Sequence, residues 1–112
     1  MLSVKTLEDF GADTKEGLAR CLNKEDFYLK MINLGIKNEH FEKLKEALSK
    51  NDVKLAFEDA HALKGTIGNL ALTPIYEPLE KLTEILRSGS TEGTKELSQE
   101  IFSKREELLS LA

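Results

Sequence analysis

The chain has 112 residues, of which 40% are apolar and 32% charged, and its net charge is −4. This length and apolar content predict a single domain, residues 1–112, with one hydrophobic core. The acidic balance argues against nucleic-acid binding, and no stretch is apolar enough to insert into a membrane. With one cysteine and two histidines, an internal disulfide is excluded and a His/Cys metal site is disfavoured. Because the N-terminus also lacks a secretory pattern, we expect a cytoplasmic protein.

Helical spacing dominates, and no segment alternates apolar and polar residues as a strand would. A first short helix is predicted around 7–10, ended by Gly11. A second follows Asp13 or Thr14, either of which can act as an N-cap, and it carries apolar residues at 18, 19 and 22. These two short helices precede the longer ones.

The stretch 24–49 contains two sets of apolar residues with helical spacing. They are Phe27, Met31 and Leu34, followed by Phe41, Leu44 and Leu48. Because Gly35 and Asn38 lie between the sets, the stretch forms either one kinked helix or two helices in sequence. The pattern does not distinguish these alternatives.

Three more helices are predicted downstream. Asn51 or Asp52 caps the first, which spans about 52–71. Thr73 caps the second, with Pro74 in its first turn, but the interior Pro78 delays regular helix to about residue 77. The second ends at 87–90, and the last spans about 91–111. Since short connections favour antiparallel neighbours, the predicted fold is an all-α antiparallel four-helix bundle with short extra N-terminal helices.

The helix at 52–71 places one histidine away from the core. At about 100° per residue, its apolar residues form an arc centred roughly 110° from His61. His61 therefore lies on a flank that faces solvent or a partner. Its neighbours on that flank, at i±3, i±4 and i±7, are Lys54, Phe57, Glu58, Lys64, Gly65 and Gly68.

The two glycines on this flank are unusual inside a helix. Each costs about 0.5–1 kcal/mol relative to alanine. Gly65 and Gly68 either allow another segment to pack closely on bare backbone or leave the His61 imidazole accessible to a second protein. Since both glycines share the flank of His61, we favour the second interpretation.

Two charged neighbours fit an accessible histidine. Lys64, at i+3, is placed to balance a phosphoryl group on His61. An imidazole is mostly neutral and nucleophilic at pH 7. Glu58, at i−3, is the nearest candidate to hold the proton on the other ring nitrogen, although a solvated glutamate is the simpler interpretation.

The run AHALKGTIGNL, residues 60–70, resembles the signature of histidine phosphotransfer (HPt) domains. The resemblance extends over almost the whole chain and implies a four-helix bundle with an exposed phosphoacceptor histidine. It implies that His61 is the phosphoacceptor, that Lys64 stabilises the phosphoryl group, and that Gly65 and Gly68 open the surface. One departure is Ala71, where the family most often has glycine, which leaves the end of the helix uncertain.

The resemblance also implies a mechanism and partners. His61 accepts a phosphoryl group from a receiver-domain aspartate and donates it to another, in two-component signalling. The partners are response-regulator receivers and/or a hybrid sensor histidine kinase. Phosphoryl transfer of this kind also needs a divalent ion, which the receiver is expected to supply, so no cofactor is expected in this chain. Nothing in the sequence binds ATP, so no kinase activity is expected, and we expect a monomer. Met1 and a complete bundle favour a free-standing protein over a domain excised from a kinase.

Two other interpretations are compatible with an exposed histidine on a helix. The dimerisation and phosphoacceptor domain of a sensor kinase typically has an acidic residue after its histidine and a proline soon afterwards, whereas here Ala62 follows and the next proline is Pro74. The second is a helical interaction module in which His61 is never phosphorylated. His40 is interpreted as an ordinary surface or helix-start residue, Cys21 as a small buried one, and the remaining carboxylates as solvated.

Overall fold

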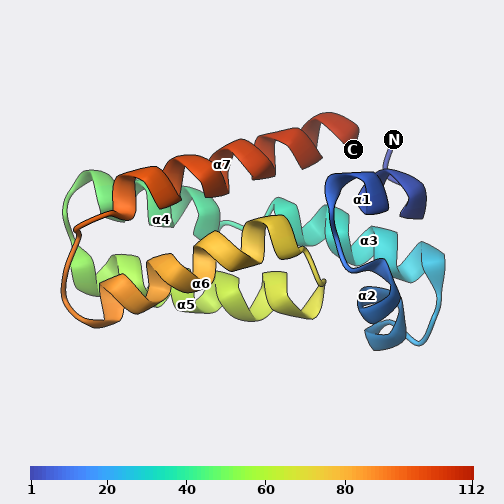
Figure 1. The fold of residues 1–112 in the computed structure, drawn as a ribbon, viewed down its shortest axis with the longest axis horizontal. Helices are drawn as coiled ribbons and strands as arrows, with labels where there is room; N and C mark the ends of the chain where they lie inside the picture. Colours follow the sequence, from blue (N-terminus) through green and yellow to red (C-terminus); the bar gives the residue numbers. More distant parts are fainter.

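The computed structural model describes all 112 residues and contains seven helices and no strand (Figure 1). The helices are α1 Val4–Phe10, α2 Thr14–Arg20, α3 Glu25–Ile36, α4 His40–Ser49, α5 Val53–Asn69, α6 Thr73–Arg87 and α7 Thr94–Leu111. None of them combines the length and the apolar character that a membrane span requires.

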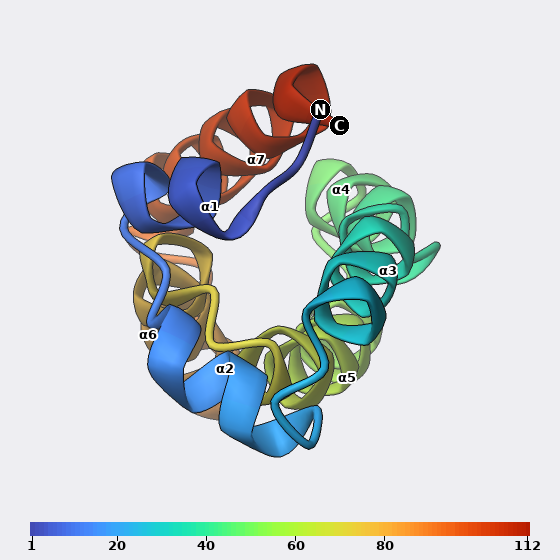
Figure 2. The ribbon, with the colours of Figure 1, turned by 90° about the vertical axis from the view of Figure 1, so that its right-hand side faces the viewer.

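Helices α4 to α7 form the predicted antiparallel four-helix bundle. Each packs along the next in chain order, α4 on α5, α5 on α6 and α6 on α7 (Figure 1). Helix α3 continues beyond one end of α4, and α1 and α2 pack at the same end of the molecule. Figure 2 shows α2 in front of the ends of α5 and α6. The N-terminal helices therefore cover one end of the bundle, where α5 meets α6.

Local capping explains where several helices begin and end. Ser3 and Thr6 form a reciprocal capping box at the start of α1, and Gly11 ends α1 in the left-handed conformation at φ 109°. The Asp13 and Asp52 side chains accept hydrogen bonds from first-turn backbone N–H groups of α2 and α5. The predicted caps at Asp13 and Asp52 are thus confirmed.

The stretch 24–49 forms two helices, which resolves the alternative left open by the sequence. Asn38 lies in the connection, and its Oδ1 accepts a hydrogen bond from the His40 backbone N–H (2.8 Å). At the end of α3, the Arg105 Nε–H from α7 donates to the carbonyl oxygen of Ile36 (2.7 Å). A side chain from the last helix thus satisfies a carbonyl that the break leaves without an intrahelical partner.

The buried face of α3 is not the one predicted from Phe27, Met31 and Leu34, but the neighbouring row of apolar residues. Tyr28, Ile32 and Ile36 are fully buried, whereas Phe27 and Leu34 are about half exposed. Both sets have helical spacing, so periodicity alone could not select the buried one. Leu22 was also misplaced, because it lies beyond the end of α2 and is exposed.

Three predicted helix boundaries need correction. Thr73 is the first residue of α6 and not its cap, and the helix runs from there through Pro78 without waiting for residue 77. Helix α5 ends at Asn69 instead of about 71, and α7 begins at Thr94 instead of about 91. The proline at position 78 is tolerated because its ring is buried against the core while α6 packs on both α5 and α7.

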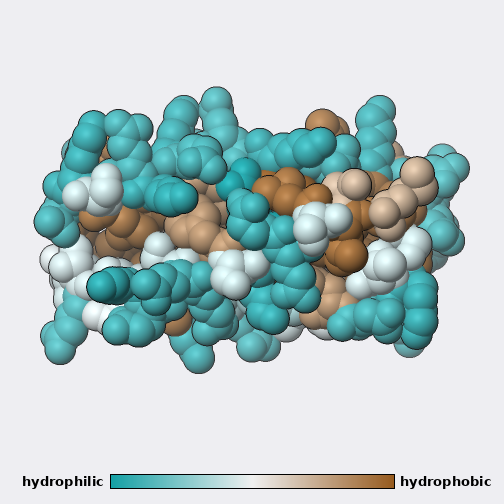
Figure 3. Space-filling model, turned by 90° about the horizontal axis from the view of Figure 1, so that it is seen from above, coloured by the Kyte–Doolittle hydropathy of each residue, from teal (hydrophilic) through white to brown (hydrophobic).

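The core runs along the whole molecule and is closed between α4 and α7 by long side chains. Phe41 of α4 and Phe102 of α7 meet edge to face at 6.3 Å between ring centroids. Arg105 lies over the Phe41 ring and also donates to Glu42 (3.1 Å). Seen from the side of α7, hydrophilic residues flank a broken apolar strip along this face (Figure 3).

Candidate functional site

His61 is the central residue of α5, and its side chain is exposed. Four residues on the opposite part of the same helix are fully buried, as the helical wheel predicts: Ala56, Ala60, Leu63 and Ile67. The amphipathic pattern of α5 therefore holds the imidazole outside the core. The one hydrogen bond made by a histidine ring in this chain belongs to His40, so both ring nitrogens of His61 are free of hydrogen bonds within the chain.

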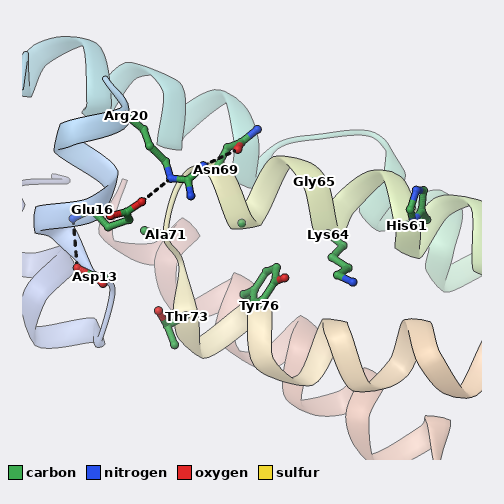
Figure 4. A pocket seen from close by; sticks show the side chains of 11 residues that line it. Asp13, Glu16, Arg20, His61, Lys64, Gly65, Asn69, Ala71, Thr73 and Tyr76 are labelled. Carbon is green, nitrogen blue, oxygen red and sulfur yellow. Dashed lines mark hydrogen bonds and ion pairs between the residues drawn. The ribbon is translucent and has the colours of Figure 1, made fainter. Parts of the chain in front are cut away.

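An open groove of about 550 Å³ begins at His61 and follows α5 towards its C-terminal end (Figure 4). Helices α2, α5 and α6 all contribute to its walls. Its lining residues are Asp13, Glu16, Arg20, His61, Lys64, Gly65, Gly68, Asn69, Ala71, Thr73 and Tyr76. The groove thus brings together four of the residues singled out from the sequence: His61, Lys64, Gly65 and Gly68.

Lys64 is half-buried one turn along α5 from His61, and its side chain extends towards α6 (Figure 4). It forms no ion pair in the structure, whereas several lysines elsewhere pair with a glutamate or an aspartate. The ammonium is therefore not already neutralised by a carboxylate of this chain. Glu58 is exposed and makes no hydrogen bond to His61.

The two glycines differ in their surroundings. A Cβ on Gly65 would meet no atom within 4 Å, whereas a Cβ on Gly68 would lie 2.9 Å from the Tyr76 ring of α6. The hypothesis that both glycines clear space for a partner therefore needs correction at Gly68, which accommodates Tyr76. Burial raises the pKa of Tyr76, and the hydrogen bond that its hydroxyl donates to Glu80 (3.2 Å) raises it further. Only Gly65 leaves open space beside His61.

Lys54, Phe57 and Glu58 lie on the N-terminal side of His61, outside the groove. The Phe57 ring stacks against the His61 imidazole, with 5.7 Å between ring centroids and 20° between planes. Lys54 is exposed and lies one turn closer to the start of α5 than Phe57 does. The surface around His61 thus has an aromatic side towards the start of α5 and a hollowed side towards its end.

Helix α2 supplies a wall of the groove that the sequence did not reveal. The Arg20 guanidinium donates to Asn69 Oδ1 (3.1 Å) and to Glu16 Oε1 (2.9 Å) (Figure 4). Asp13 lines the same wall. No periodicity links positions 13–20 to positions 61–69, because only the tertiary packing of α2 brings them together.

A second feature was missed on the opposite side of α5. Asp59 is 4% exposed, and its Oδ1 lies 2.9 Å from Nδ1 of His40 in α4. Its other oxygen, Oδ2, is buried without a hydrogen-bond partner. The expectation of solvated carboxylates is therefore wrong for Asp59. His40 does start a helix as expected, but it also ties α4 to α5 through this carboxyl group.

The fold and site describe a helical bundle with an accessible histidine and a neighbouring unpaired lysine. No three or more metal-binding side chains are grouped together. A protein-family model described as the Hpt domain matches residues 38–111, about two thirds of the chain. The chain therefore belongs to the Hpt domain family of phosphorelays. No curated protein and no solved structure matches it significantly. The family match covers α4 to α7 and leaves α1 to α3 outside.

Proposed function

We propose that this protein relays a phosphoryl group between receiver-domain aspartates by way of a phosphohistidine at His61. The observation that carries the proposal is the exposed, unbonded imidazole at the centre of α5, within a chain of the Hpt family. Lys64 and the open space over Gly65 lie directly beside it.

The relay has two steps, and its bonds balance without a further reactant. In the first, a ring nitrogen of neutral His61 attacks the phosphorus of a receiver phosphoaspartate, and the aspartate leaves as a carboxylate. In the second, an aspartate oxygen of another receiver attacks the same phosphorus, and the N–P bond breaks. The proton on the other ring nitrogen stays in place throughout. Both steps depend on in-line approach and charge stabilisation.

Lys64 supplies a positive charge on the side of this chain. A phosphorylated imidazole carries a charge near −2 on its phosphoryl oxygens, and a lysine at i+3 on a helix reaches that position. The divalent ion is assigned to the receiver, whose aspartate site would hold it. The protein then acts as a carrier with no kinase activity of its own.

The receiver docks on both sides of His61. On one side lies the groove with Gly65 and Gly68, and on the other lie Phe57, Lys54 and Glu58. The α2 wall adds Arg20, whose guanidinium is held over Asn69. We assign the protein to the cytoplasm as a monomer, with receivers or a hybrid kinase as its partners.

Incubation with phosphorylated receiver domains tests this function. Wild type should take up acid-labile, alkali-stable label, and His61→Gln should take up none, while His40→Gln, the matched control on the other histidine, should still be labelled. If wild type binds receivers but is never labelled, it is an interaction module and the proposal fails. Size measurement addresses the sensor-kinase alternative, which requires an obligate dimer.

A further inference from the structure

Three side chains from two helices form a continuous stack that ends on the imidazole. The guanidinium carbon of Arg87, the last residue of α6, lies 5.0 Å from the Phe57 ring centroid. The Phe57 ring in turn stacks on His61 at 5.7 Å, with the two planes only 20° apart. Arg87 is also paired through its Nε with Glu84 Oε1 one turn back (3.3 Å).

The stack matters because no hydrogen bond within the chain orients the imidazole. His61 is exposed and makes no hydrogen bond within the chain, so the rotation of its ring is not restricted by a donor or an acceptor. Reacting groups that are held in one geometry transfer faster than groups that must be ordered during the reaction. An aromatic contact with nearly parallel planes restricts the ring in the absence of a hydrogen bond.

Phe57 itself is held from the α6 side. It is half-buried and packs against the core, and a cation–π contact with Arg87 fixes its outer part. The antiparallel packing of α5 and α6 explains this contact, because it brings the C-terminal end of α6 beside the first turns of α5. The stack is therefore built by tertiary structure and not by α5 alone.

We infer that Phe57, supported by Arg87, is a positioning residue that orients the His61 imidazole for phosphoryl transfer. The inference rests on the proposed function and gives Phe57 a role besides docking. Kinetics distinguish the two roles of Phe57. Loss of docking raises the receiver concentration needed for half-maximal transfer, whereas loss of orientation lowers the rate at saturating receiver.

The test uses Phe57→Leu, which removes the ring, and Phe57→Tyr, which keeps it. In wild type, proton NMR should show the His61 ring protons shifted upfield by the Phe57 ring current, with His40 as internal reference. Phe57→Leu should abolish this shift and slow transfer at saturating receiver by about 2- to 10-fold, the factor expected for such an aromatic contact. Phe57→Tyr should keep both the shift and the rate at saturation. A rise in the half-saturating receiver concentration of Phe57→Leu would report the lost docking contact, separately from the slower transfer at saturation.

Arg87→Gln provides a second variant at an exposed helix end, where folding is not at risk. It should weaken the upfield shift and slow transfer in the same direction, and Arg87→Lys should restore both. A folded Phe57→Leu with an unchanged His61 resonance, or with wild-type transfer at saturation, would overturn the inference. If wild type accepts no phosphoryl group, the proposed function fails, while the NMR comparison still decides whether Phe57 orients the ring.

Discussion

The ring of Tyr76 in α6 packs against the bare backbone of Gly68 in α5, whereas no atom lies over Gly65 three residues earlier. The two helical glycines beside His61 therefore serve different purposes. One allows close packing of two helices, and the other leaves the surface open. This difference leads to opposite expectations for the same substitution.

Gly65→Ala should raise the free energy of unfolding by about 0.5–1 kcal/mol, because alanine is the better helix former and its methyl group meets nothing. If a receiver uses the open space, the same variant should transfer more slowly. Gly68→Ala should show no such gain in stability, since its methyl group displaces the Tyr76 ring. Denaturant unfolding compares the two, and an equal gain in both would contradict the packing role of Gly68.

Lys64→Ala should fold as wild type does and transfer phosphoryl groups more slowly, because it removes a positive charge beside His61 without breaking an ion pair. Lys95→Ala, on the exposed surface of α7, is the matched control for a lost lysine. Single-turnover transfer from a labelled receiver measures both variants. Transfer by Lys64→Ala at the rate of the control would remove Lys64 from the mechanism.

Ala71→Gly should stabilise the protein by about 1 kcal/mol. Ala71 follows α5 with φ of 57°, in the left-handed region where a side chain is strained and glycine is not. This geometry also explains why a glycine suits the position. Thermal unfolding measures the effect, and a fall in the melting temperature would mean that the buried methyl group outweighs the strain.

His40→Ala should destabilise the protein by roughly 1–3 kcal/mol, because it leaves the buried Asp59 carboxyl group without its one hydrogen-bond partner. Adding Asp59→Leu in the same chain should recover much of the loss, since no polar group then remains buried and unpaired. Urea unfolding of the single and double variants forms the test. A double variant less stable than His40→Ala would contradict this explanation.

Stability should fall in alkali as Tyr28 ionises. Tyr28 is fully buried, and its hydroxyl donates to the Leu70 carbonyl (2.9 Å). Burial, with Cys21 and Asp13 nearby, raises the pKa of Tyr28 from 10.0 to about 12. The folded state thus favours the neutral phenol, and this contribution is complete below pH 10 and lost between pH 10 and 12. In unfolding experiments, the free energy of unfolding of Tyr28→Phe should lack that part of the pH dependence. If the stabilities of wild type and Tyr28→Phe fall in parallel between pH 10 and 12, the explanation is contradicted.

The sequence predicts the bundle and the exposure of His61 well, because one strong apolar stripe at Ala60, Leu63 and Ile67 determines how α5 is rotated. It predicts α3 less well, since Phe27 and Tyr28 both begin apolar rows with helical spacing. Tertiary contacts distinguish them, because Tyr28 packs against the bare backbone of Gly17 and donates its hydroxyl to the Leu70 carbonyl.

The parts of the site that the sequence did not reveal all depend on contacts between distant segments. Arg20 reaches Asn69 only because α2 packs over the end of α5, and His40 reaches Asp59 only because α4 packs along α5. The stack on His61 likewise requires Arg87 from α6. Periodicity within one helix places a side chain on a face, but it does not say which other helix supplies its neighbours.

The most direct measurement of the central proposal is to locate the phosphoryl group by mass spectrometry, under non-acidic conditions, after exposure to the phosphorylated receivers of the source organism. We expect one phosphoryl group on His61, none on His40, and its departure when an unphosphorylated receiver is added. Absence of phosphorylation with every receiver, or retention of the group in His61→Gln, would contradict the proposal that His61 carries the relay.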